Sequence, residues 1–206
     1  MSEACKIKLF LLGDSSVGKT TLIYKFVKDT FRNVYLPTIG FDHAIKEIIL
    51  DNGKKLKIYF HDTAGQEKYR SIAFNLIKSA EGIILMYDIT KKETFNAIPE
   101  WVKNIRDHKG KDFPIVLIAN KCDLKEEREV EAEEGQKEAE KNGFLFYEMS
   151  CKDGINVQES ILKLVSVILE RNKKKEKNEK EGEKKEESIK LKIENKPKKK
   201  KKKFKC

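Results

Sequence analysis

A glycine-rich loop motif limits the folds available to this chain more than any other feature. Gly13-Asp14-Ser15-Ser16-Val17-Gly18-Lys19-Thr20 fits the pattern G-x-x-x-x-G-K-[ST] in full. An apolar run, Ile7–Leu12, precedes the motif, and a helix-like stretch, Lys19–Lys28, overlaps its end. Glycines let such a loop wrap its backbone N–H groups around a phosphate, and the following helix offers its positive N-terminus to the anion. The motif therefore predicts a phosphate-binding loop between a strand and a helix.

The chain from residue 40 to residue 171 alternates strand-like and helix-like segments. Further strands are expected at Ala44–Leu50, Leu56–Phe60, Gly82–Tyr87, Ile115–Ala119 and Phe144–Tyr147. Further helices are expected at Tyr69–Ser79, Lys92–Asp107, Val130–Lys141 and Asn156–Arg171. Between the first two strands, Asp51-Asn52-Gly53 is typical of a hairpin turn. The pattern predicts an α/β fold, a mostly parallel six-stranded sheet with one antiparallel edge strand and helices on both faces.

Four side chains and one glycine suggest phosphate chemistry. Lys19 is expected to reach the β- and γ-phosphates of a nucleotide, and the Thr20 hydroxyl to ligate Mg²⁺. Asp62 follows the second hairpin strand, where a carboxylate is expected to anchor the same ion through water. Gly65 lets the backbone approach a γ-phosphate, and Gln66 is expected to orient an attacking water.

A further group of residues follows the apolar run Ile115–Ala119. In Asn120-Lys121-Cys122-Asp123, the Asp123 carboxylate can accept hydrogen bonds from N1–H and the exocyclic amine of guanine, whereas adenine offers neither donor. A wrong base would leave that carboxylate unpaired, so the site discriminates strongly. Lys121 can lay its stem over the base. Ser150-Cys151-Lys152 follows the last strand, where a backbone N–H can meet guanine O6.

These segments, in this order and over about residues 5–170, resemble small GTPases of the Ras superfamily. The resemblance implies binding of GTP and GDP with Mg²⁺, slow hydrolysis of GTP, and two loops that change shape with the γ-phosphate. It implies Thr38 as a second Mg²⁺ ligand, Tyr35 as a tyrosine that closes over the phosphates, and Phe31 as the aromatic beside guanine. The implied phosphate-binding residues are Gly13, Asp14, Ser15, Ser16, Val17, Gly18, Lys19, Thr20, Thr21, Tyr35, Thr38 and Gly65. The implied guanine-binding residues are Phe31, Asn120, Lys121, Asp123, Ser150, Cys151 and Lys152.

Within that superfamily the chain resembles Rab GTPases, which act in vesicle traffic by recruiting effectors to membranes in the GTP state. The resemblance rests on Ile39-Gly40-Phe41-Asp42, Glu67-Lys68-Tyr69-Arg70-Ser71-Ile72, Leu85-Met86-Tyr87-Asp88-Ile89-Thr90 and Phe95 with Ile98-Pro99-Glu100-Trp101. It implies a monomer that meets an exchange factor, effectors, a carrier protein for the prenylated form, and a GTPase-activating protein that supplies an arginine. A Ras-like signalling GTPase and a GTP-binding scaffold without hydrolysis are the alternatives.

The aromatic triad usual on the effector-facing surface of Rab proteins is replaced here. The corresponding positions are His43, His61 and Leu76. The imidazoles are either flat substitutes for aromatic rings or a pH-sensitive effector surface, because histidine titrates near neutrality.

The net charge of +10 comes from 44 Lys+Arg and 34 Asp+Glu. Residues 171–206 hold 18 Lys+Arg and 7 Asp+Glu, a balance of +11, so residues 1–170 sum to −1. We expect a GTPase domain over residues 1–171 and a disordered, Lys-rich tail over 172–206. The lysines of Lys198–Lys203, followed by Cys206, predict a polybasic patch beside a geranylgeranyl group. We expect these two signals together to anchor the protein to the anionic cytoplasmic face of intracellular membranes, and the protein to cycle between those membranes and the cytosol.

Composition and charge argue against several other classes. No segment approaches 18 consecutive apolar residues, so no membrane-spanning helix is expected. The N-terminus lacks a secretory pattern, and four scattered cysteines fit a reducing compartment. The tail lacks aromatic residues other than Phe204, which disfavours nucleic acid as its partner.

Overall fold

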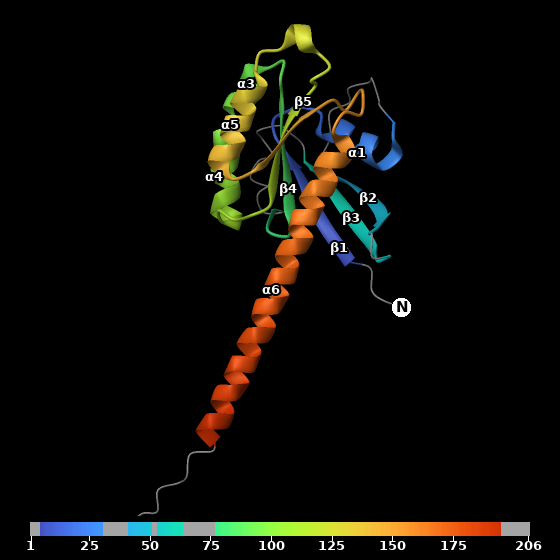
Figure 1. Cartoon of the computed structure of the whole chain (residues 1–206). Helices are drawn as coiled ribbons and strands as arrows, with labels where there is room; N and C mark the ends of the chain where they lie inside the picture. The colour runs from blue at the N-terminus through green and yellow to red at the C-terminus, as the bar shows by residue number, and fades with distance from the viewer. Residues whose placement is uncertain (1–4, 31–40, 51–52, 64–76, 195–206) are drawn as a thin grey trace, which may run out of the picture. The chain divides into compact units, whose positions relative to one another are not determined.

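The computed structural model describes residues 5–30, 41–50, 53–63 and 77–194 (Figure 1). In these residues a six-stranded sheet has the strand order β2-β3-β1-β4-β5-β6. The strands are β1 Cys5–Leu12, β2 Phe41–Ile49, β3 Lys55–Thr63, β4 Gly82–Asp88, β5 Ile115–Asn120 and β6 Leu145–Met149. Only the edge pair β2–β3 is antiparallel among the strands of this sheet. The predicted α/β fold with one antiparallel edge strand is confirmed.

The central strands consist mostly of consecutive apolar residues because helices cover both of their faces. Every residue of β4 and of β5 is buried. Figure 1 shows α3 (Lys92–Asn96), α4 (Ile98–Lys109) and α5 (Ala132–Asn142) on one side of the sheet and α1 (Lys19–Lys28) on the other. Because parallel strands place their carboxyl ends at one edge, the loops after β1, β4, β5 and β6 gather there.

The predicted hairpin turn between β2 and β3 is closed by backbone hydrogen bonds. Leu50 N donates to Lys54 O at 2.9 Å, and Gly53 N donates to Leu50 O at 2.8 Å. Gly53 has φ +75°, a left-handed conformation that favours glycine. Asp51 and Asn52 lie outside the described residues.

Helix α1 has the predicted bounds, but the helix predicted over Lys92–Asp107 is two helices. Helix α3 ends before Ala97, and α4 begins at Ile98 with Pro99 in its first turn. Proline has no N–H to donate to α3 and its fixed φ suits a helix start, so the chain restarts there. Helix α5 begins after Glu131 rather than at Val130, because Glu131 and Glu134 form a reciprocal capping box.

The last helix differs most from its prediction. Helix α6 spans Val157–Glu194, whereas the sequence pattern predicts its end at Arg171 and disorder beyond. Lysine and glutamate are strong helix formers, and oppositely charged pairs four residues apart stabilise a helix, so the composition beyond Arg171 also suits a helix. The chain divides into two compact units, 1–168 and 169–206, and the predicted domain boundary near residue 171 stays a prediction. No described helix is long and apolar enough to cross a bilayer.

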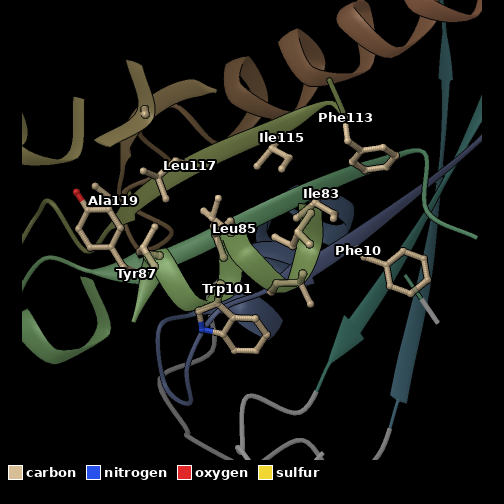
Figure 2. Packing of buried hydrophobic residues seen from close by; sticks show 14 of the residues in the cluster. Phe10, Ile83, Leu85, Tyr87, Trp101, Phe113, Ile115, Leu117 and Ala119 are labelled. Atoms are coloured by element: carbon tan, nitrogen blue, oxygen red, sulfur yellow. The ribbon is translucent and has the colours of Figure 1, made fainter. Parts of the chain in front are cut away.

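A hydrophobic cluster lies between the sheet and α4 (Figure 2). Helix α4 buries Ile98, Trp101, Val102 and Ile105, the i, i+3, i+4, i+7 pattern of a helix with one apolar face. These side chains pack against β4 and β5, where Figure 2 shows Leu85 and Leu117. This packing holds the carboxyl ends of both strands in place, and the candidate site lies at those ends.

Candidate nucleotide-binding site

The predicted phosphate loop connects β1 to α1, and its two glycines are required by close contacts. Gly13 and Gly18 have φ of +130° and +102°. A Cβ at Gly13 would lie 2.2 Å from Met86 O, and one at Gly18 would lie 2.2 Å from Asn120 Nδ2. Real Cβ atoms do not approach other atoms this closely, so both the backbone conformation and the space exclude a side chain.

Lys19 is held inside this loop. Its Nζ donates to Gly13 O at 2.9 Å and to Asp14 O at 2.7 Å, and the residue is 6% exposed. Burial lowers the pKa of Lys19 to about 8, although the Asp62 and Asp14 carboxylates act to raise it. The ammonium is therefore charged at pH 7 but poorly hydrated, which strengthens its attraction for an anion that enters the loop.

Two of the three predicted metal ligands meet. Thr20 Oγ1 donates to Asp62 Oδ2 at 2.5 Å, so the start of α1 and the end of β3 bring a hydroxyl beside a carboxylate. Asp62 is 1% exposed. Hard oxygen donors of this kind are the ligands that Mg²⁺ prefers, so this pair of side chains fits the ion. The third predicted ligand, Thr38, lies outside the described residues.

Asn120 connects the phosphate loop to the loop after β6. Its Nδ2 donates to Val17 O at 2.8 Å, although the two residues are 103 positions apart. Its Oδ1 accepts from Cys151 N at 3.3 Å. Burial raises the pKa of the Cys151 thiol to about 12, so this side chain stays protonated. The buried amide of Asn120 thus links three predicted site segments.

The predicted base-reading carboxylate is oriented by a neighbour. Asp123 Oδ1 accepts from Ser150 Oγ at 2.7 Å, and Lys152 Nζ lies 3.9 Å from Asp123 Oδ2. Ser150 Oγ in turn accepts from Asp153 N at 3.0 Å. The Asn120–Asp123 and Ser150–Lys152 segments are therefore neighbours at one end of the sheet.

Two residues that were not predicted to lie at the site also contact it, although both belong to segments that carry the family resemblance. Trp101 Nε1 on α4 donates to Asp14 Oδ1 at 2.9 Å. Asp88 at the end of β4 forms an ion pair with Lys121. Neither contact is local in sequence, so no spacing pattern could have indicated it. The signals in the sequence were the place of both residues in those segments, a tryptophan in a helix-like stretch and an aspartate directly after an apolar run.

Several predicted residues lie outside the described part of the chain. These are Phe31, Tyr35, Gly65, Gln66, Leu76 and Cys206. His43 and His61 are directly opposite each other in the β2–β3 register, so the two positions are neighbours. The His61 ring stacks on Phe10, with centroids 4.3 Å apart.

Comparison with known proteins agrees with this arrangement. A profile of the Ras family matches residues 8–170. The chain is 43% identical over 168 residues to Ras-related protein Rab-8 of Diplobatis ommata, an alignment that covers 81% of this chain and 80% of the relative. The chain belongs to the Rab family. It is also 42% identical over 164 residues to human Rab-3A and 40% identical over 164 residues to bovine Rab-3C, alignments that cover 80% of this chain and 74% and 72% of the relatives.

As a Rab-family GTPase, this protein binds GTP and GDP, hydrolyses GTP to GDP and phosphate, and acts as a molecular switch in membrane traffic. Its partners by family are an exchange factor, a GTPase-activating protein and effectors. Nothing in the fold or the comparisons favours the alternatives of a Ras-like signalling GTPase or a GTP-binding scaffold without hydrolysis.

Proposed function

We propose that this Rab GTPase binds its nucleotide at the carboxyl ends of β1, β3, β5 and β6, with the phosphates in the Gly13–Thr20 loop. The observation that carries the proposal is the Asn120 amide, which joins Val17 of that loop to Cys151 of the base-side loop. One nucleotide touching both loops would contact the phosphate-binding and guanine-binding sets predicted from the sequence, which include Phe31, Tyr35 and Thr38.

Lys19 and the oxygen ligands supply the phosphate chemistry in this proposal. The buried Lys19 ammonium binds the β- and γ-phosphates and stabilises charge on the leaving diphosphate. Thr20, Thr38 and, through water, Asp62 would hold Mg²⁺. The ion neutralises phosphate charge when it is bound. Gln66 orients the water that attacks the γ-phosphorus, and an arginine from a GTPase-activating protein accelerates the step by about 10³- to 10⁵-fold.

Substitution of the proposed water-orienting residue tests the hydrolytic role. Gln66→Leu should keep GTP binding and slow single-turnover phosphate release, because leucine cannot position water by hydrogen bonding. Phosphate release and GTP affinity are measured on the same preparation. Turnover equal to that of the unsubstituted protein would remove Gln66 from the proposed mechanism.

Substitution of the base-reading carboxylate tests the site itself. Asp123→Asn should weaken GTP binding and admit xanthosine nucleotides, because the amide donates where guanine also donates. Asp153→Asn is the matched control, since Asp153 is an exposed aspartate of the neighbouring loop and meets Ser150 only through its backbone N–H. Retained guanine selectivity in Asp123→Asn would refute the base assignment.

We further propose that the domain ends near residue 171 and that residues 172–206 carry the membrane anchor. Lys198–Lys203 and a geranylgeranyl group on Cys206 together would bind an anionic cytoplasmic leaflet. A carrier protein would return the lipidated monomer to the cytosol. Intact-mass measurement of the protein from its native cells tests the modification, and an unmodified Cys206 would end this part of the proposal.

A further inference from the structure

A buried aspartate lies beside the base-reading segment. Asp88 is the last residue of β4 and stands directly opposite Asn120 in the parallel β4–β5 register. It is 0% exposed. An ionised carboxylate is rarely buried so completely unless other groups compensate its charge. The groups that surround Asp88 therefore show what it does.

One carboxylate oxygen of Asp88 is occupied by the turn that follows β4. Asp88 Oδ1 accepts from Thr90 N at 2.9 Å and from Thr90 Oγ1 at 2.8 Å. The Asp88 backbone is held as well, because Thr94 Oγ1 accepts from Asp88 N at 3.0 Å. These contacts fix the rotation of the carboxyl group and direct Oδ2 away from the turn.

The second oxygen faces Lys121. Asp88 Oδ2 forms an ion pair with Lys121 Nζ, and the lysine side chain is 31% exposed. Lys121 has φ +69°, an uncommon left-handed conformation for a residue with a side chain. The backbone next to it is tied to the same turn, since Ile89 N donates to Asn120 O at 3.1 Å. Lys121 O also accepts from Leu124 N at 2.9 Å, so Lys121 is held at both its backbone and its ammonium.

A lysine free in solution samples many rotamers and loses that freedom when it must lie against a ligand. An ammonium already held by a buried carboxylate loses less on binding, so the complex forms with higher affinity. We propose that Asp88 is a positioning residue for the guanine nucleotide: it anchors the Lys121 ammonium so that the lysine stem lies along the base. This inference rests on the proposed role of Lys121 in guanine binding.

A double-mutant cycle on the full chain tests the inference, with the dissociation rate of a fluorescent GDP analogue as the readout. Asp88→Asn keeps an amide oxygen for the two Thr90 bonds and the side-chain volume, but removes the charge that holds Lys121. We expect it to release the analogue about 10- to 100-fold faster, the range for loss of one hydrogen bond to a charged group. In the Lys121→Met background, Asp88→Asn should change the rate by no more than about twofold.

Glu148→Gln is the matched control. Glu148 lies on β6 and pairs with Arg128 at 2.7 Å, so this variant removes a carboxylate from the same end of the sheet without touching Lys121. It should alter GDP release by no more than about twofold. An equal acceleration in Glu148→Gln would overturn the inference, because general loss of charge would then explain the effect.

The remaining outcomes separate the inference from the proposed function. Faster release in Lys121→Met with no change in Asp88→Asn overturns the inference alone. Equal acceleration by Asp88→Asn in both backgrounds assigns Asp88 a purely structural role and also overturns it. If the rate of GDP release is unchanged in Lys121→Met, that lysine does not contribute to base binding. The proposed role of Lys121 and the inference about Asp88 then both fail.

A second measurement needs no substitution at Asp88. In the GDP complex of the unsubstituted protein, the Lys121 ammonium should exchange its protons with water more slowly than that of the exposed Lys103, as followed by NMR on ¹⁵N-labelled lysine. Equal exchange at the two ammonium groups would show that Asp88 does not hold Lys121 in the bound state, and would overturn the inference.

Discussion

At the scale of single residues, the site depends on side chains that hold other side chains. The motif residues Lys19 and Asp123 are each fixed by a neighbour's carbonyl or hydroxyl oxygen. Trp101 acts on the phosphate loop in the same way, through its bond to Asp14. The chain contains one tryptophan, so this contact can be followed by fluorescence.

Loss of the indole donor should loosen the phosphate loop. Trp101→Phe keeps an aromatic ring in the core but removes the hydrogen bond to the Asp14 carboxylate, and we expect GDP affinity to fall by about 1.5–3 kcal/mol. Asp14→Asn, which retains an acceptor, should lose less. In the unsubstituted protein, GDP addition should change the tryptophan emission. An emission spectrum that is the same with and without GDP would contradict a contact between Trp101 and the occupied loop.

Nucleotide affinity should depend on pH through Lys19. The pKa of Lys19 is lowered by burial from 10.5 to about 8. Phosphate binding favours the charged form, so GDP binding takes up a proton and weakens as pH rises through 8. In the protein without nucleotide, the free energy of unfolding depends on pH in the opposite direction. Lys19 keeps its proton up to about pH 10.5 in the unfolded chain but only up to about pH 8 in the folded protein, so the unfolded chain binds more protons between these values. The Lys19 contribution to the free energy of unfolding therefore rises with pH across that window.

The affinity part of this prediction is measured by titrating GDP from about pH 6.5 to 8.5, around the lowered pKa. Lys19→Arg provides the comparison, because a guanidinium stays charged over this range and should remove the dependence. An identical pH profile in the two proteins would assign the effect to another group.

At the scale of elements, helix–sheet contacts set which residues each position accepts. Helix α5 carries Gly135 on the face that packs against β4 and β6. A Cβ there would lie 2.2 Å from the Tyr87 hydroxyl and 2.6 Å from the Phe146 ring. The glycine therefore permits close approach of α5 to the sheet, although glycine weakens a helix by its propensity.

Gly135→Ala should destabilise the protein in spite of alanine's better helix propensity. The added methyl group overpacks the contact with Tyr87, and we expect the free energy of unfolding to fall by about 1–3 kcal/mol. Gln136→Ala on the exposed side of the same helix is the control and should change it by about 0.5 kcal/mol or less. Both are measured by denaturant unfolding of the GDP-bound protein; stabilisation in Gly135→Ala would show that α5 can move away from the sheet.

At the scale of the whole molecule, charge is separated along the chain. Residues 1–170 are near neutral, and residues 171–206 carry a balance of +11. A near-neutral domain gives little electrostatic attraction to a lipid surface, so any such attraction must come from the last 36 residues.

Replacing Lys198–Lys203 with glutamine should weaken binding to vesicles that contain anionic lipid. Each lysine near such a surface contributes about 1 kcal/mol at low salt, so the loss should be large in dilute buffer and small at high ionic strength. Glutamine at Lys173–Lys175, which lie in a stretch that also carries glutamates, should cost less. Vesicle cosedimentation measures both, and equal losses for each lysine replaced would show that total charge, rather than the terminal patch, governs binding.

Much of the fold followed from local pattern. The bounds of α1 and the hairpin at Gly53 were predicted because caps, turns and apolar runs are properties of neighbouring residues. The break between α3 and α4 was not, although Pro99 marked it, because the apolar spacing continues across Ala97. The continuation of α6 beyond Arg171 was missed because a lysine- and glutamate-rich composition that argues against a packed core also has a high helix propensity.

By itself the sequence determined which chemical groups the proposed nucleotide site contains, because each motif is a short segment whose residue types suit a phosphate or a base. The tertiary structure decided which groups orient them. Trp101 meets Asp14, and Asp88 meets Lys121, only because α4 packs on the sheet and because β4 lies beside β5. Such pairs have no periodic pattern in the sequence, since the number of residues between their members is set by strand order and helix packing rather than by local geometry.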